Sequence, residues 1–306
     1  MKSFEEIYAE ILETSKKELE KTRKKFLLKP IFCVILAIIT FFLGIYFLDE
    51  TQDLSQQMLV IMCETIFPWV FMALAVIFYL SPGKKYKELY KHQIIEKFIA
   101  CYDSNLHYNY TKGIKKEIYD EGLFETYNIY NTDDLIEGKL KQYPVSIAEV
   151  LTKSAPEDEG YPITCFHGMV CVSELNCLFN GSIRVRLDQK LWKKVYENKK
   201  EKLEMDSSEF EEYFDVFAED KIQAMQVLTS DVMEVILQFV QETKIKFDFT
   251  INRNRLLIRF QTGEIFEPNL RKSLVNTKML KKAYDIINFS FEMIIALRKI
   301  LEEIQL

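Results

Sequence analysis

Two apolar stretches decide the fold of this 306-residue chain. They are Ile31–Leu48, with the sequence IFCVILAIITFFLGIYFL, and Met58–Leu80, with the sequence MLVIMCETIFPWVFMALAVIFYL. The first contains no charged residue, and the second contains only Glu64. A helix that crosses a bilayer needs about 20 mostly apolar residues. The sequence therefore predicts two transmembrane helices, at about 31–48 and 58–80, within a hairpin over residues 30–80.

Basic residues gather at the two span ends that lie away from the short connecting loop. The loop carries Asp49, Glu50 and Asp53 and no base. Because lysine and arginine favour the cytosolic side, we expect a multi-pass protein of the cell membrane with both termini in the cytoplasm. The flanking bases are Lys16, Lys17, Lys21, Arg23, Lys24, Lys25 and Lys29 before the first span, and Lys84, Lys85, Lys87 and Lys91 after the second.

The two segments outside the hairpin are predicted to be cytosolic. Residues 1–29 form an amphipathic helix, since apolar residues recur at helical spacing over 3–27. We expect this stripe to pack on another helix, the alternative being a solvated helix that leads into the membrane. Residues 81–306 form an α+β domain. It begins with an amphipathic helix over 84–102 and continues through a tyrosine-rich stretch over 105–135, whose rings we expect to pack into a domain edge.

The α+β domain is predicted to hold an antiparallel sheet, because the apolar period shortens towards two after residue 135. Asn180-Gly181 predicts a tight hairpin turn flanked by Phe179 and Ile183. A helix capped by Asp206 or Ser207 runs through Phe214. The predicted strands are Val145–Leu151, Ile163–Cys171, Ile183–Leu187, Lys244–Thr250 and Arg255–Gln261, with a hairpin at 252–254 joining the last two.

Two longer helices complete the prediction. One starts near 229–231, where Asp231 and Glu234 have capping-box spacing, and runs to about Glu242. The other is a long C-terminal helix over 279–304. The fold class is thus α+β, with a sheet that is either open or barrel-like. The barrel-like form with a C-terminal helix is similar to pleckstrin-homology-like modules, an analogy that implies no function.

No catalytic, cofactor-binding or metal-binding residue stands out in the sequence. Gly-x-Ser-x-Gly elbows, phosphate-binding glycine loops and the Rossmann fingerprint are missing. The best metal candidate is the set Cys165, His167, Cys171 and Cys177, but its spacing is unlike a zinc site, and residues 165, 167 and 171 share one strand face. We therefore expect small core residues there, and no cofactor.

Two acidic residues within apolar stretches leave a functional role open. Glu64 lies in the second span near the outer loop, where we expect an interfacial position; the alternative is an ion or proton role. Glu149 lies in the predicted strand 145–151, where we expect it to face solvent; the alternative is a buried functional acid. The net charge of −6 gives no basic face for a nucleic acid.

Several segments in order resemble an uncharacterised bacterial family of two-span membrane proteins, catalogued as domain of unknown function 3137. The resemblance extends roughly from residue 30 to 300. It implies a bacterial membrane protein, and it supplies no catalytic residue. Its segments are the two spans, Asp134–Gly138, Ile147–Val150, Phe166–Met169, Leu203-Glu204, Phe210–Phe217, Leu228-Thr229 and Phe266–Pro268.

The leading functional hypothesis is a membrane-tethered scaffold module that binds a protein or lipid partner at the inner membrane face. Whether the chain is an enzyme stays open, and the sequence favours that it is not. The first alternative is a hydrolase or other enzyme with an unrecognised site. The second is a component of a transport or channel complex. Neither the partner nor the oligomeric state follows from the sequence.

Overall fold

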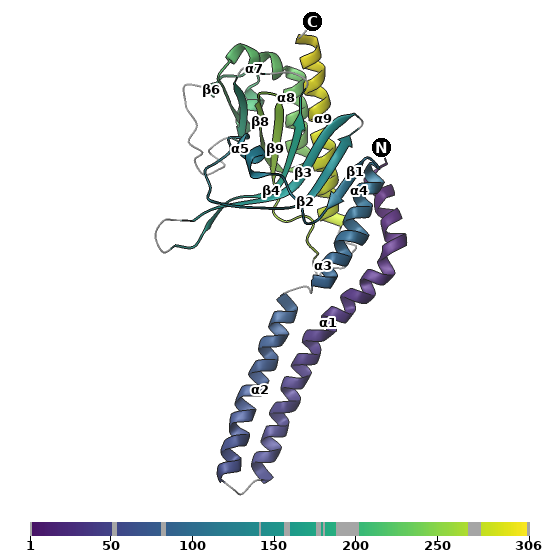
Figure 1. Ribbon diagram of the computed structural model, residues 1–306, viewed down its shortest axis with the longest axis vertical. Coiled ribbons are helices and arrows are strands. Elements are labelled where there is room, and N and C mark those ends of the chain that lie inside the picture. Colours follow the sequence, from purple (N-terminus) through teal and green to yellow (C-terminus); the bar gives the residue numbers. More distant parts are fainter. Residues whose placement is uncertain are drawn as a thin grey trace. The chain divides into compact units, whose positions relative to one another are not determined.

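The computed structural model describes residues 2–50, 54–80, 84–140, 142–155, 160–175, 179, 181–187, 202–268 and 277–304 (Figure 1). The chain divides into two compact units. One unit contains Met1–Ile7, Glu96–Phe266 and Lys278–Leu306, and the other contains Tyr8–Ile95 and Glu267–Thr277. The domain boundaries at 29/30 and 80/81 stay predictions.

The two apolar stretches are helical. Helix α1 spans Phe4–Glu50 and helix α2 spans Leu54–Leu80, and both contain a segment long and apolar enough to cross a membrane. The predicted helix 3–27 and the first span are one continuous helix, because Pro30 lies inside α1 without ending it. The apolar side chains of these segments are largely exposed; Phe32, Phe42 and Trp69 are 62%, 63% and 76% exposed.

Three short helical segments follow one another after α2. They are α3 (Lys84–Tyr90), the π-helical turn η1 (Lys91–Ile95) and α4 (Glu96–Tyr102). The predicted amphipathic helix over 84–102 is therefore present, with one π-turn inside it. In the unit that holds α3 and η1, Lys87 and Lys91 both bind Glu267, at 2.8 Å and 3.0 Å. This shared carboxylate compensates the charge of Lys91, which is only 5% exposed.

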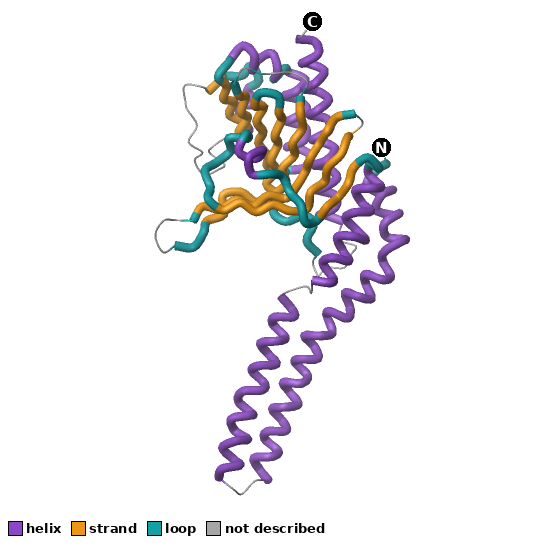
Figure 2. Tube along the Cα trace, in the orientation of Figure 1, coloured by secondary structure: helices purple, strands orange, loops and turns teal. Residues whose placement is uncertain are grey.

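A nine-stranded antiparallel sheet forms the centre of the other unit (Figure 2). Its order is β1-β2-β3-β4-β9-β8-β5-β7-β6. The sheet is open, with β1 and β6 as its edges, so the barrel-like alternative is wrong. The strands are β1 (Leu106–Asn109), β2 (Ile129–Leu140), β3 (Tyr143–Ser154), β4 (Ile163–Glu174), β5 (Ser182–Leu187), β6 (Lys202–Leu203), β7 (Phe214–Ala218), β8 (Lys246–Asn252) and β9 (Arg255–Gln261).

The turn predicted at Asn180-Gly181 does not join neighbouring strands. Gly181 has φ +88° and precedes β5, in agreement with a turn, while Asn180 lies outside the described residues. Strand β4 pairs with β9, however, and β5 pairs with β8 and β7. The turn predicted at Asn180-Gly181 therefore does not pair β4 with β5, since a turn signal specifies a local bend and not the strand that pairs across it.

Besides α4, this unit contains the helices α5 (Lys116–Asp120), α6 (Ser208–Tyr213), α7 (Lys221–Val227), α8 (Ser230–Thr243) and α9 (Thr277–Ile304). Ser207 caps α6 by accepting a hydrogen bond from the Phe210 backbone N–H at 3.2 Å, as predicted. Phe214 belongs to β7, so the helix ends one residue earlier than expected. Helix α8 is capped by Thr229 without a side-chain hydrogen bond, so the capping-box assignment of Asp231 and Glu234 is wrong.

Each face of the sheet has its own packing layer. Helices α8 and α9 cover one face, where Phe239 of α8 stacks on Phe289 of α9 at 4.0 Å and both contact Phe247 and Phe260 (Figure 1). The segment between β1 and β2 covers part of the other face, with the ring of Tyr119 against the surrounding aromatic rings. These rings pack inward, as predicted for the tyrosine-rich stretch.

Candidate functional site

The first candidate site begins with an irregularity in strand β2. The pairing of β2 with β3 shifts register between Asp133 and Ile136. At this bulge Asp134 adopts φ +56°, a left-handed conformation that aspartate tolerates better than most residues. As a result the side chain of Asp134 is fully buried, while that of Asp133 stays exposed.

Glu149 of β3 lies opposite Asp133 in the register and is only 5% exposed. The expectation that it faces solvent is therefore wrong. The extended segment after β9 covers it, and its Oε1 accepts hydrogen bonds from the backbone N–H groups of Ile265 and Phe266, at 2.5 Å and 3.0 Å. A single carboxylate thus fixes two consecutive peptide groups of that segment.

The environment of Glu149 favours its protonated form. Burial raises the pKa of this carboxyl group to about 8. The two backbone N–H donors act to lower the pKa, and the negative charges of Asp134 and Asp133 act to raise it further. The Tyr108 hydroxyl donates to Asp134, and burial together with that carboxylate holds the tyrosine pKa above its ordinary value.

Oxygen ligands from Asp133, Asp134 and Glu149 lie within 4.8 Å of one another. Carboxylate oxygens at such separations are the ligand type that calcium and magnesium prefer. Asp134 and Glu149 already accept hydrogen bonds from the protein, which leaves fewer of their lone pairs for an ion. The cluster could therefore hold either a proton or a divalent cation.

Three of the segments that carry the family resemblance converge at this cluster. Asp134 begins the segment 134–138, Glu149 lies in 147–150, and Phe266 begins 266–268. The ring of Phe266 also contacts that of Tyr108, with centroids 6.0 Å apart. Segments far apart in the sequence are thus joined through one buried carboxylate.

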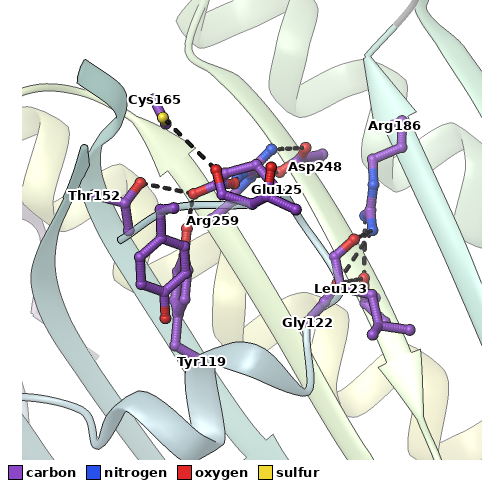
Figure 3. Close-up of polar contacts among 12 residues, drawn as sticks. Tyr119, Gly122, Leu123, Glu125, Thr152, Cys165, Arg186, Asp248 and Arg259 are labelled. Carbon is purple, nitrogen blue, oxygen red and sulfur yellow. Dashed lines mark hydrogen bonds and ion pairs between the residues drawn. The ribbon is translucent and has the colours of Figure 1, made fainter. Parts of the chain in front are cut away.

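The second candidate site is a group of buried charges on the sheet face opposite α8 and α9 (Figure 3). Arg259 of β9 binds Asp248 of β8 through two hydrogen bonds, at 2.5 Å and 2.8 Å, and its third nitrogen binds Glu125. Burial acts to lower the pKa of Arg259, but the carboxylates of Asp248 and Glu125 hold it well above its ordinary value. The guanidinium therefore stays charged.

The charged side chains of this network bind other groups of the protein. Glu125 Oε1 accepts from the hydroxyls of Tyr119 and Thr152, at 2.9 Å and 2.7 Å (Figure 3). The guanidinium of Arg259 stacks on the Phe124 ring, with its Cζ 4.3 Å from the centroid. Arg186 of β5 donates to the carbonyls of Gly122 and Leu123, at 3.1 Å and 3.0 Å.

Arg186 of β5 and Arg259 of β9 thus bind the segment 119–125 to the sheet. Such saturation is typical of a structural network, because a binding site needs donors that are available to a ligand. We therefore assign the Arg186 and Arg259 group to stability and keep the carboxylate cluster as the candidate functional site.

The cysteine and histidine set does not converge in the described residues. A register shift between β3 and β4 occurs at Cys165, whose Sγ contacts the Thr126 carbonyl at 3.9 Å on the face that carries Arg259. Cys171 is buried on the other face beside Ser290 of α9, and burial raises the pKa of its thiol to about 12. The expectation that 165 and 171 share one face is therefore wrong. Cys177 lies outside the described residues, as does the side chain of Glu64.

Sequence reasoning overlooked Asp134, Asp248 and Arg259. For Asp248 and Arg259 the signal is the same as for Glu149: a charged residue between apolar residues in a strand that is buried on both faces. In FDF at 247–249 and IRF at 258–260, every neighbour is buried. A charge at such a position needs a compensating partner, and its presence indicates one elsewhere in the chain.

Comparisons with known proteins extend the description. Residues 164–299 match the family described as "Protein of unknown function (DUF3137)", which confirms the resemblance over these residues. A search of the curated proteins found no match. Among solved structures, the chain is similar to the mycobacterial trehalose monomycolate transport factor A, TtfA, with 11% sequence identity and a TM-score of 0.40 over 72% of this chain and 96% of that one.

Proposed function

We propose that this chain is a membrane-anchored module whose α+β domain works at the cytosolic face by binding a protein or lipid partner. The exposure of apolar side chains along both long helices carries the proposal. Soluble monomers rarely expose contiguous apolar patches larger than a few hundred Å². A lipid environment removes that surface from water, and an α-helix satisfies its backbone hydrogen bonds internally there.

The hydroxyl groups within the two helices also suit a lipid environment. Thr40 donates to the carbonyls of Leu36 and Ala37, and Thr65 donates to those of Ile61 and Met62. Hydroxyls that donate to their own helix need no hydrogen-bond acceptor in the surrounding lipid. This pattern is compatible with an anchor.

Fractionation of cells that express the full chain tests the anchor. We expect the chain in the membrane pellet after an alkaline carbonate wash, and in solution only after detergent is added. Mild-detergent purification then tests the binding role, since co-eluting proteins or lipids should recur between preparations. Recovery of the chain in the carbonate supernatant would contradict the anchor, and repeated recovery of the chain alone would contradict the binding role.

The second candidate is a metal-dependent hydrolase, which the clustering of Asp133, Asp134 and Glu149 favours. Calorimetry with magnesium, calcium or manganese tests this candidate on the full chain in detergent. Under this hypothesis the wild type binds one ion, and Asp134→Asn abolishes the binding. The matched control is Glu137→Gln, an exposed acid three residues along the same strand. Absence of heat in the wild type at millimolar metal would exclude the candidate.

A further inference from the structure

A stripe of lysines runs along one side of helix α1. Lys21, Lys25 and Lys29 are four residues apart and therefore lie on nearly the same side of the helix, with Lys24 beside them. All four side chains are exposed. None of them forms an ion pair with a described acidic side chain, so no described carboxylate balances their charges.

Several other described bases of this unit form ion pairs within the protein. Arg23 binds Glu20 at 2.8 Å, and Lys87 and Lys91 share Glu267. Arg23 lies on the opposite side of α1 from the stripe, the side on which Phe26 contacts Tyr86 of α3. Among the described side chains of α1, the lysines of the stripe therefore lie on the side away from Arg23.

The same side of α1 becomes apolar within two turns. Leu28 and Phe32 continue the stripe and are 60% and 62% exposed. Lys29 marks the transition, and its ammonium lies 4.5 Å from the Phe26 ring centroid and 5.7 Å from that of Phe78, in the last turn of α2. Such a change from exposed lysines to exposed apolar residues is typical of a helix that passes from headgroups into hydrocarbon.

From Lys21 to Lys29 the helix rises about 12 Å, at roughly 1.5 Å per residue. The headgroup region of one leaflet is about 6 Å thick, and a lysine side chain extends a few ångströms along the surface. Within the stripe, Lys24, Lys25 and Lys29 thus reach the headgroup layer when Ile31 lies at the edge of the hydrocarbon, and Lys21 lies farther out.

We propose that Lys24, Lys25 and Lys29 form a binding site for the phosphate headgroups of anionic phospholipids. This inference rests on the proposed membrane anchor and names its lipid partner. Each phosphate supplies the negative charge that balances a lysine ammonium group of the stripe. The nearby ring of Phe78 offers an apolar contact for the acyl chain. Basic residues next to a cytosolic membrane face recognise anionic lipids through the same electrostatics.

Lipid exchange on the full chain tests the site. The purified chain is equilibrated in mixed micelles of phosphatidylglycerol and phosphatidylcholine at a ratio of about one to four, and native mass spectrometry counts the lipids that stay bound. We expect the wild type to enrich phosphatidylglycerol over its bulk share. Expressed as the bound ratio of phosphatidylglycerol to phosphatidylcholine divided by the bulk ratio, the enrichment should fall roughly fivefold or more in the triple variant K24Q/K25Q/K29Q, since a single surface lysine contributes about that factor.

Two matched variants separate the effect of the lysine charges on lipid binding from an effect on folding. The variant K221Q/K246Q/K282Q removes three exposed lysines of the other unit and should keep the enrichment. The variant K24R/K25R/K29R keeps the positive charges and should also keep the enrichment of phosphatidylglycerol. If the glutamine variant fails to fold, raising salt to about 0.5 M on the wild type should reduce the enrichment, because screening weakens exposed charges.

Bound lipid at the bulk ratio in the wild type would overturn the proposal, as would equal enrichment in the two glutamine variants. Both outcomes differ from failure of the anchor itself, in which the wild type stays in solution without detergent and retains no phospholipid of either kind.

Discussion

Replacing Glu149 with glutamine removes the charge from the carboxylate cluster and keeps its shape. The glutamine Oε1 can still accept from the backbone N–H groups of Ile265 and Phe266. The amide nitrogen adds donors that face Asp134 and Asp133 in place of a third negative charge. The variant should therefore resemble the protein with Glu149 permanently protonated.

The magnitude follows from the pKa of Glu149, which burial raises from 4.5 to about 8. Between these values the folded chain binds more protons than the unfolded chain, so the free energy of unfolding falls as the pH rises. The stabilisation that the protonated Glu149 carboxyl group gives to the folded chain is fully present below pH 4.5 and lost above pH 8. At about 1.36 kcal/mol per pKa unit the full loss is about 5 kcal/mol, of which about 4 kcal/mol falls between pH 5 and pH 9.

The assay is thermal unfolding of the full chain in detergent, followed by circular dichroism from pH 5 to pH 9. For a domain of about 200 residues, 4 kcal/mol corresponds to roughly 8–16 °C in Tm. We expect the Tm of the wild type to fall relative to that of Glu149→Gln by this amount across the range. Glu137→Gln, an exposed change on β2, should follow the wild type. Parallel curves for Glu149→Gln and the wild type would refute the reasoning.

Three further substitutions test the packing, and each is compared with the wild type by Tm at pH 7. Arg259→Met leaves the buried carboxylate of Asp248 without its bidentate partner and should destabilise the chain by about 3–5 kcal/mol; a loss under 1 kcal/mol would contradict the buried network. Gly168→Ala adds a Cβ that would lie 1.9 Å from a carbonyl oxygen of β9, so we expect loss of folded protein; a normal yield and Tm would show that β4 does not approach β9 as described. Ser207→Ala removes the cap of α6 and should cost about 1 kcal/mol, whereas Ser207→Asp should restore most of it; no difference among the three would exclude the cap.

The parts of the fold that sequence predicted are those set by local periodicity. Helices α2, α8 and α9 and strands β3, β4, β8 and β9 carry regular apolar patterns, and their predicted and observed bounds differ by a few residues. Strands β1 and β2 were missed because the tyrosine-rich stretch has no clear period of two, and the bulge at Asp133 and Asp134 interrupts β2. Pairing was also missed where it is non-local, since β5 lies between β8 and β7.

The candidate site was less predictable than the fold. Glu149 was recognised as an acid within an apolar strand, but its burial depends on Ile265 and Phe266, more than 100 residues along the chain. Asp134 turns inward because of a left-handed residue at a bulge, which sequence spacing does not reveal. Buried charges therefore indicate that a site exists, while the partners that complete it depend on the tertiary fold.

The most direct test of the membrane anchor is protease access in spheroplasts that express the full chain. One version of the chain carries an epitope inserted in the loop at 51–53, and a second version carries the same epitope after Leu306. The account predicts that external protease removes the loop epitope and spares the C-terminal one until the membrane is permeabilised. Removal of the C-terminal epitope from intact spheroplasts, or protection of the loop epitope, would contradict it.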